Sequence, residues 1–173
     1  MDARRESEPT PMKNHTTAER KSERELVVTR TINGPARIVF EAWTKPELFK
    51  QWWVPKSFGL SVLSCEMDVR VGGRYRLEFA HGDSQSAFFG TYKEVTPHSR
   101  LVWTNEEGGD SGQVTTVTFE ERGGKTLLIM HDLYPSKEAL DGAIASGSTG
   151  GMGETFEQLD ELLAALGTSV GRS

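Results

Sequence analysis

The chain has 173 residues, 36% of them hydrophobic, which is enough apolar material for one buried core. Its formal net charge of −5 argues against a nucleic-acid partner, because binding phosphates requires a concentrated basic surface. The single cysteine, Cys65, favours a reducing compartment, and we expect a cytoplasmic protein. No apolar run approaches the roughly 20 residues that a membrane-spanning helix needs, so we expect no membrane insertion.

The two ends of the chain differ in composition from its middle. Residues 1–24 carry many charges and almost no large apolar side chain, so they cannot offset the entropy lost on ordering. We therefore predict a flexible tail over residues 1–24, a single domain over residues 25–167, and a short flexible C-terminus over residues 168–173.

The domain is expected to begin with one strand and two short helices. Over residues 25–32, apolar and polar residues alternate with the period of two that a strand requires. Pro35 suits the first turn of a helix, and an apolar helical face follows it as far as Thr44. A second short helix is predicted over residues 46–53.

Residues 60–134 are a succession of strand-like stretches separated by turn residues, a pattern typical of an antiparallel meander. Gly72 and Gly73 predict a tight hairpin turn between the first two stretches. The six expected strands are 62–69, 74–79, 86–95, 100–106, 113–121 and 125–133.

A long amphipathic helix closes the chain. After Pro135 the apolar period becomes helical, with Phe156, Leu159 and Leu163 on one stripe and acidic residues on the other side. The fold class is therefore α+β, with a curved antiparallel sheet of about seven strands wrapped around the long C-terminal helix. One helix cannot fill the concave face of such a sheet, so large side chains fill the remainder or a cavity stays there.

Four stretches of the chain resemble a known family: VTRTINGPARIVFEAWTKPELFKQWWVPKSF, MDVRVGGRYRLEF, GTYKEVTPHSRLVWT and VTFEERGGKTLLIMHD. In order along residues 25–166, they are similar to the bacterial proteins named after the activator of the Hsp 90 ATPase, in the START and Bet v 1-like (SRPBCC) superfamily. The resemblance implies a helix-grip fold with a deep apolar cavity, used in the superfamily for lipids, sterols, polyketides and aromatic molecules. Met152 departs from the family, which usually has tryptophan there.

We predict that the protein encloses a hydrophobic or aromatic small molecule between the sheet and the C-terminal helix, without catalysing a reaction. The lining of this pocket follows from the alternation of the strands and the apolar stripe of the helix. The expected residues are Tyr75, Leu77, Phe79, Phe88, Tyr92, Trp103, Val117, Phe119, Met152, Phe156 and Leu159.

Two further candidates each have a competing structural interpretation. A tryptophan on a short helix is more often core than cavity rim, and of the adjacent Trp52 and Trp53 we expect Trp53 to be less buried and to line the rim. Arg30 lies on the apolar face of its strand and needs a partner. We favour an ion pair with a carboxylate such as Glu41 or Asp68, and the alternative is an anchor for a ligand carboxylate.

Metal and cofactor chemistry find no support in the sequence. Cys65 stands alone and the histidines have no mutual spacing typical of ligands, so we expect no metal and no cofactor. His131 next to Asp132 suggests acid–base chemistry, but no nucleophile stands beside them and we favour a structural role. The four histidines are His15, His81, His98 and His131.

Alternative functions remain open at this point. An enzyme of the cyclase or hydrolase type would use the same cavity, and convergent polar groups inside it would support that function. A module that assists a chaperone ATPase is suggested only by the family name. Over residues 126–130, the positions on both faces of the strand are apolar. This suggests that the outer face of this strand is also covered, for example in a homodimer.

Overall fold

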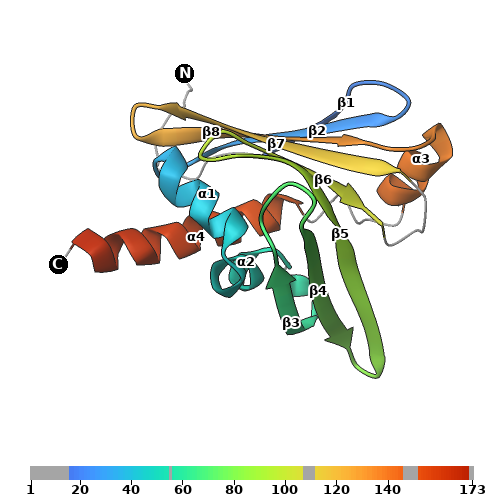
Figure 1. The fold of residues 1–173 in the computed structure, drawn as a ribbon, viewed down its shortest axis with the longest axis horizontal. Helices are drawn as coiled ribbons and strands as arrows, with labels where there is room; N and C mark the ends of the chain where they lie inside the picture. Colours follow the sequence, from blue (N-terminus) through green and yellow to red (C-terminus); the bar gives the residue numbers. More distant parts are fainter. Residues whose placement is uncertain (1–15, 55, 107–111, 146–151, 172–173) are drawn as a thin grey trace, which may run out of the picture.

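The computed structural model describes residues 16–54, 56–106, 112–145 and 152–171, the last five of these as backbone only. One antiparallel sheet of eight strands, in the order β1-β2-β8-β7-β6-β5-β4-β3, curves strongly around the helices (Figure 1). The strands are β1 (Thr17–Arg20), β2 (Glu25–Ile32), β3 (Ser61–Met67), β4 (Arg74–His81), β5 (Ser84–Thr96), β6 (Arg100–Asn105), β7 (Gln113–Arg122) and β8 (Lys125–Leu133).

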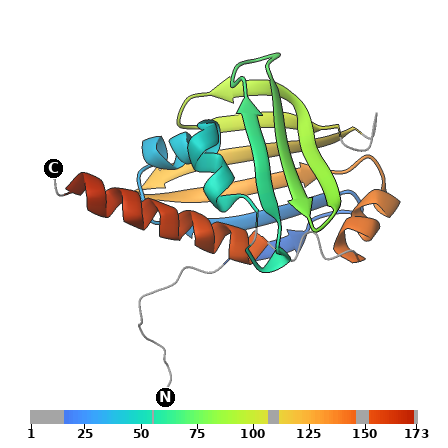
Figure 2. The ribbon, with the colours of Figure 1, turned by 90° about the horizontal axis from the view of Figure 1, so that it is seen from below.

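The helices lie inside the curve of the sheet and at one of its ends. Seen from below, the C-terminal helix crosses the concave side of the sheet, and α1 and α2 lie next to it (Figure 2). α1 packs on β7 and β8, α2 on β3, and α4 on β2. The helices are α1 (Ala36–Thr44), α2 (Pro46–Trp52), the short 3₁₀ helix η2 (Lys56–Phe58), α3 (Lys137–Ala145) and α4 (Met152–Gly171).

Local sequence explains where the first two helices begin and end. Glu121 of β7 accepts a hydrogen bond from the backbone N–H of Ala36 at 2.9 Å, which satisfies a free donor in the first turn of α1. Lys45 is extended, as expected for a residue before proline, and ends α1. Pro46 then starts α2, because a proline at the first helical position sacrifices no helix hydrogen bond.

The predicted sheet lacked one strand. Residues 17–20 form β1, which pairs antiparallel with β2, so the sheet has eight strands where about seven were expected, and β1 lies within the segment expected to be a tail. All four side chains of β1 are exposed. A strand attached at a sheet edge gains its stability from backbone hydrogen bonds, so it needs no large apolar residues and composition does not reveal it. Residues 1–15, the rest of the predicted tail, lie outside the described residues.

Two further features, the end of α4 and the pairing of β3, differ from the sequence prediction. α4 continues to Gly171, so residues 168–171 extend the helix that was expected to end at residue 167. On β3 the pairing with β4 shifts between Val62 and Ser64. This bulge turns Leu63 outward, where 51% of its surface is exposed, although Cys65 and Met67, two and four residues later, line the cavity.

The hairpin between β3 and β4 confirms the glycine turn. Gly72 has a φ of +85°, which side chains rarely tolerate. Gly73 is needed for space, since a Cβ atom there would lie 1.9 Å from the carbonyl oxygen of Asp68.

The solid part of the core lies between α1, α4 and the central strands. Within the described part of the chain, no helix is long and apolar enough to cross a membrane. The largest fully buried side chains are Trp43, Trp52, Phe156, Ile32, Leu101, Leu128, Leu140 and Leu159.

Candidate functional site

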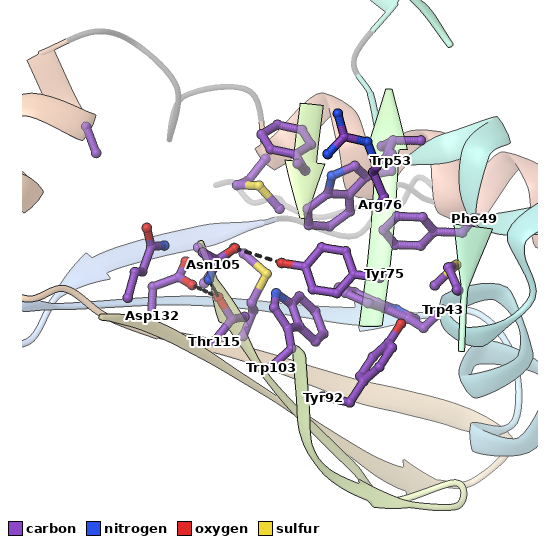
Figure 3. Close-up of a pocket in the computed structure, with 18 of the residues that line it drawn as sticks. Trp43, Phe49, Trp53, Tyr75, Arg76, Tyr92, Trp103, Asn105, Thr115 and Asp132 are labelled. Atoms are coloured by element: carbon purple, nitrogen blue, oxygen red, sulfur yellow. Dashed lines mark hydrogen bonds between the residues drawn. The ribbon is translucent and has the colours of Figure 1, made fainter. Parts of the chain in front are cut away.

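A cavity of about 280 Å³ lies between the sheet, the first two helices and the beginning of α4 (Figure 3). All seven strands from β2 to β8 contribute to its wall. Its lining residues are Leu26, Val28, Trp43, Phe49, Trp53, Cys65, Met67, Tyr75, Arg76, Leu77, Phe88, Tyr92, Trp103, Asn105, Gln113, Thr115, Met130, Asp132, Tyr134, Ala143 and Met152.

Aromatic rings from the helices and the sheet form one side of the cavity. The rings of Phe49 and Trp53 are stacked with centroids 5.0 Å apart, and Trp43 meets Trp53 edge to face at 5.6 Å. On the sheet side, the Tyr75 ring lies 5.7 Å from that of Tyr92. Offset and edge-to-face contacts of this kind stabilise aromatic clusters beyond the burial of their area. We call this side of the cavity the aromatic wall.

The two adjacent tryptophans of α2 have different roles. Trp52 is fully buried, and its indole N–H donates to the carbonyl oxygen of Ala42 at 3.0 Å. Trp53 is only partly buried and lines the cavity, as expected from the angle between neighbours on a helix. The indole N–H of Trp43 is buried without a hydrogen-bond partner among the described residues, which is uncommon in folded proteins.

Side chains of α4 hold the segment that carries Trp53. The amide of Gln158 donates to the carbonyl oxygens of Trp52 and Val54 at 2.9 and 3.0 Å. Its oxygen accepts from the backbone N–H of Lys56 at 2.8 Å. Gln158 therefore satisfies three backbone groups at the end of α2, and it fixes the position of the aromatic wall relative to α4.

The opposite end of the cavity is polar. Thr115 donates to a carboxylate oxygen of Asp132 at 2.5 Å, and the amide of Asn105 donates to the Thr115 hydroxyl at 2.8 Å. Thr115 and Asp132 are 3% and 6% exposed. Burial raises the pKa of the Asp132 carboxyl, although hydrogen bonds from Thr115 and Gln113 oppose this shift. We call Asn105, Gln113, Thr115 and Asp132 the polar cluster.

Tyr75 connects the two ends of the cavity. Its hydroxyl donates to the carbonyl oxygen of Thr104 at 2.8 Å and lies 3.4 Å from the side-chain oxygen of Asn105. Gly90 makes this approach possible, because a Cβ atom there would lie 2.9 Å from the Tyr75 hydroxyl and 1.9 Å from the Thr104 carbonyl oxygen. Figure 3 shows Asp132, Thr115 and Asn105 gathered on the side away from Trp53.

Buried weak acids complete the lining. Burial raises the pKa of the Cys65 thiol to about 11 and that of the Tyr134 hydroxyl to about 12. It also raises the pKa of Tyr92 well above its usual value. These groups therefore stay neutral at physiological pH, and Cys65 is a poor nucleophile.

Seven of the residues predicted to bind a ligand line the cavity, and their binding role stays a prediction. The others lie elsewhere: Phe119 on β7, a strand that α1 covers, packs on Trp43, and Phe156 on α4 is fully buried. Phe79 packs on Phe88 with ring centroids 5.0 Å apart, outside the lining. The seven are Trp53, Tyr75, Leu77, Phe88, Tyr92, Trp103 and Met152; outside the lining are Phe79, Val117, Phe119, Phe156, Leu159 and Arg30.

Arg30 forms an ion pair within the fold. One guanidinium nitrogen lies 2.9 Å from a carboxylate oxygen of Asp160 on α4, and another donates to the Thr16 hydroxyl at 2.8 Å. The carboxylate also accepts from the backbone N–H of Asn33 at 2.9 Å. The partner is thus Asp160 rather than Glu41 or Asp68, and Arg30 ties β2 to α4.

The sequence prediction missed the polar cluster, although alternation places it on the inner face. Thr115 precedes the inward Val117 by two residues, and Asp132 follows the inward Met130 by two. His131 consequently points to the other face of the sheet, where its ring nitrogen lies 2.8 Å from the Glu25 carboxylate. His131 and Asp132 therefore do not form an acid–base pair. Among the described residues, no three His, Cys, Asp or Glu side chains gather into a group that could hold a metal.

Comparisons with known proteins agree on the fold. The model of the family described as Activator of Hsp90 ATPase homolog 1-like protein matches residues 33–164. A solved structure from Nitrosomonas europaea is 25% identical, with a TM-score of 0.78 over 86% of this chain and 99% of that chain. One from Staphylococcus epidermidis is 28% identical, with a TM-score of 0.71 over 86% and 94%. One from Rhodobacter sphaeroides is 24% identical, with a TM-score of 0.80 over 87% and 99%. No curated protein is significantly similar in sequence.

Proposed function

Because this chain belongs to the Activator of Hsp90 ATPase homolog 1-like family, as its motifs predicted, we propose that it binds a small hydrophobic or aromatic molecule in the cavity between the sheet and α4. The fold is that of a superfamily of ligand-binding domains. The cytoplasmic location and a homodimer stay predictions.

The observation that supports this proposal is the aromatic wall. Trp53, Tyr75 and Tyr92 border a space that their own side chains do not fill. A cavity of about 280 Å³ lies just below the range of about 300–1,000 Å³ typical of ligand pockets, so it suits a small molecule of about two or three rings. Flat ligands stack on such rings with the same preference for offset and edge-to-face contacts that side chains have.

Dye binding tests the proposal. N-phenyl-1-naphthylamine is uncharged, and its fluorescence rises in an apolar site. We expect wild type to bind it and Ala143→Phe to lose most of the binding, because Ala143 on α3 lines the cavity and a ring there would enter it. Ala145→Phe, on the same helix but exposed, is the matched control and should bind as wild type does. No binding by wild type, or equal binding by Ala143→Phe, would contradict the proposal.

A second candidate is an enzyme of the cyclase or hydrolase type in the same cavity. The observation that favours it is the buried Asp132, whose raised pKa suits a group that exchanges protons with a substrate. Such an enzyme would convert a bound compound rather than release it unchanged. Mass spectrometry of ligands recovered after incubation with wild type and Asp132→Asn distinguishes the two functions.

A further inference from the structure

We propose that the polar cluster is a head-group site, in which the Asp132 carboxyl accepts a hydrogen bond from a hydroxyl or amine of the ligand. This inference rests on the proposed function and specifies the class of ligand: an aromatic molecule with a hydrogen-bond donor at one end. The rings would lie against the aromatic wall, and the donor would point to Asp132.

The fold does not require a carboxyl group at the position that Asp132 occupies in the sheet. Its register partners are Leu26 on β2 and Thr115 on β7, so it lies in the interior of the sheet rather than at an edge. An apolar side chain would fit there at a lower cost, because burying a carboxyl group in an apolar interior is expensive. Buried ionisable groups of this kind are concentrated at functional sites.

The carboxyl group also keeps capacity to accept hydrogen bonds. Thr115 and Gln113 donate to Asp132, whereas an ionised carboxylate offers about four acceptor positions. In the part of the chain that the structure describes, no Lys, Arg or His side chain forms a salt bridge with Asp132. A donor on the ligand would use the remaining acceptor positions.

The same cluster disfavours an anionic head group. In its ionised form Asp132 would repel a carboxylate or phosphate, and the cationic Arg76 at the cavity lining is already engaged by Glu78 at 2.7 Å. Arg30 is bound to Asp160 and lies outside the lining. The charge arrangement therefore selects neutral or positively charged donors, and the ligand-carboxylate anchor considered for Arg30 is not part of this site.

A matched pair of probes tests the inference. 2-Naphthol and 2-methoxynaphthalene share one ring system, but the methyl group removes the donor. We expect wild type to bind 2-naphthol about tenfold or more tighter than 2-methoxynaphthalene, measured by isothermal titration calorimetry. In Asp132→Leu the ratio of the two dissociation constants should fall to about one. Asp132→Asn keeps the shape of the side chain and should give an intermediate ratio, because a neutral acceptor forms a weaker bond.

The controls separate the inference from the proposed function. Thr126→Val changes another buried hydroxyl of β8, one that donates to the Gly34 carbonyl outside the lining, and should leave the ratio unchanged. If wild type binds neither probe, the proposed function fails. If wild type binds both equally well, or if both Asp132 variants keep the wild-type ratio, the cavity still binds apolar molecules but the head-group site is refuted.

Discussion

The two halves of the space beneath the sheet differ, although the same strands border both. Along β7, the inward side chains Phe119 and Val117 lie in the solid core, whereas Thr115 lines the cavity. Along β8, Leu128 is core and Asp132 lines the cavity. On both strands the apolar positions belong to the part of the core that packs against α1, and the polar positions lie at the cavity. Inward positions that pack against a helix therefore have to be apolar, whereas inward positions at the cavity can hold polar side chains.

We expect the largest difference in unfolding free energy between the two halves when one side chain in each half is shortened. Phe156 is fully buried beside Trp43 and Trp52, so Phe156→Ala should cost about 3–5 kcal/mol of unfolding free energy. Met152 lines the cavity one helical turn earlier, and Met152→Ala should cost clearly less because one side of the thioether already lacks contacts. Urea denaturation measures both. Equal losses would mean that the cavity half is as solid as the core.

A single methyl group on Gly90, which is not itself a lining residue, should damage the cavity half. Gly90→Ala places a Cβ atom 1.9 Å from the Thr104 carbonyl oxygen and 2.9 Å from the Tyr75 hydroxyl, so we expect a loss of about 1–3 kcal/mol. The matched control is Gly142→Ala on α3, where nothing lies within 4 Å of the added atom and a helix should tolerate or favour alanine. Both are measured by urea denaturation, and similar stability of the two variants would contradict the account of Gly90.

The pH dependence of stability tests whether the Asp132 carboxyl group is buried in the cavity half. Because burial raises its pKa in the folded state, the unfolded chain releases this proton first as pH rises above about 3.9. Stability contributed by the neutral acid is therefore full below that pH and is lost as pH rises toward the folded pKa. Wild type should lose stability over this window relative to Asp132→Asn, measured by thermal melts across pH.

An exposed carboxylate gives the opposite sign and serves as the control. Hydrogen bonds from Lys137 and Arg20 lower the pKa of Asp141. Its contribution is present above the unfolded pKa and is lost as pH falls through the folded pKa, so wild type should lose stability in acid relative to Asp141→Asn. The same trend for both variants would show that Asp132 is not buried as described.

These two regions also show how far the sequence predicts the molecule. Alternation on the strands and the stripe of α4 predicted the fold and most of the aromatic wall, because burial of large side chains leaves a periodic pattern. The polar cluster obeys the same period, but the expected lining was drawn from apolar and aromatic residues and so omitted Thr115 and Asp132. β1 and the bulge at Leu63 were missed because backbone pairing at an edge leaves no apolar pattern. The partner of Arg30, Asp160, is 130 residues away and follows only from tertiary packing.

A crystal structure of the protein soaked with 2-naphthol tests the central claim most directly. The account predicts the two rings inside the cavity against Trp53 and Tyr75, with the naphthol oxygen within hydrogen-bond distance of the Asp132 carboxyl. The positions of the core residues around Phe156 should not change on binding. A cavity closed by its own side chains, or naphthol bound only elsewhere on the protein, would contradict the claim that this half of the fold is a binding site.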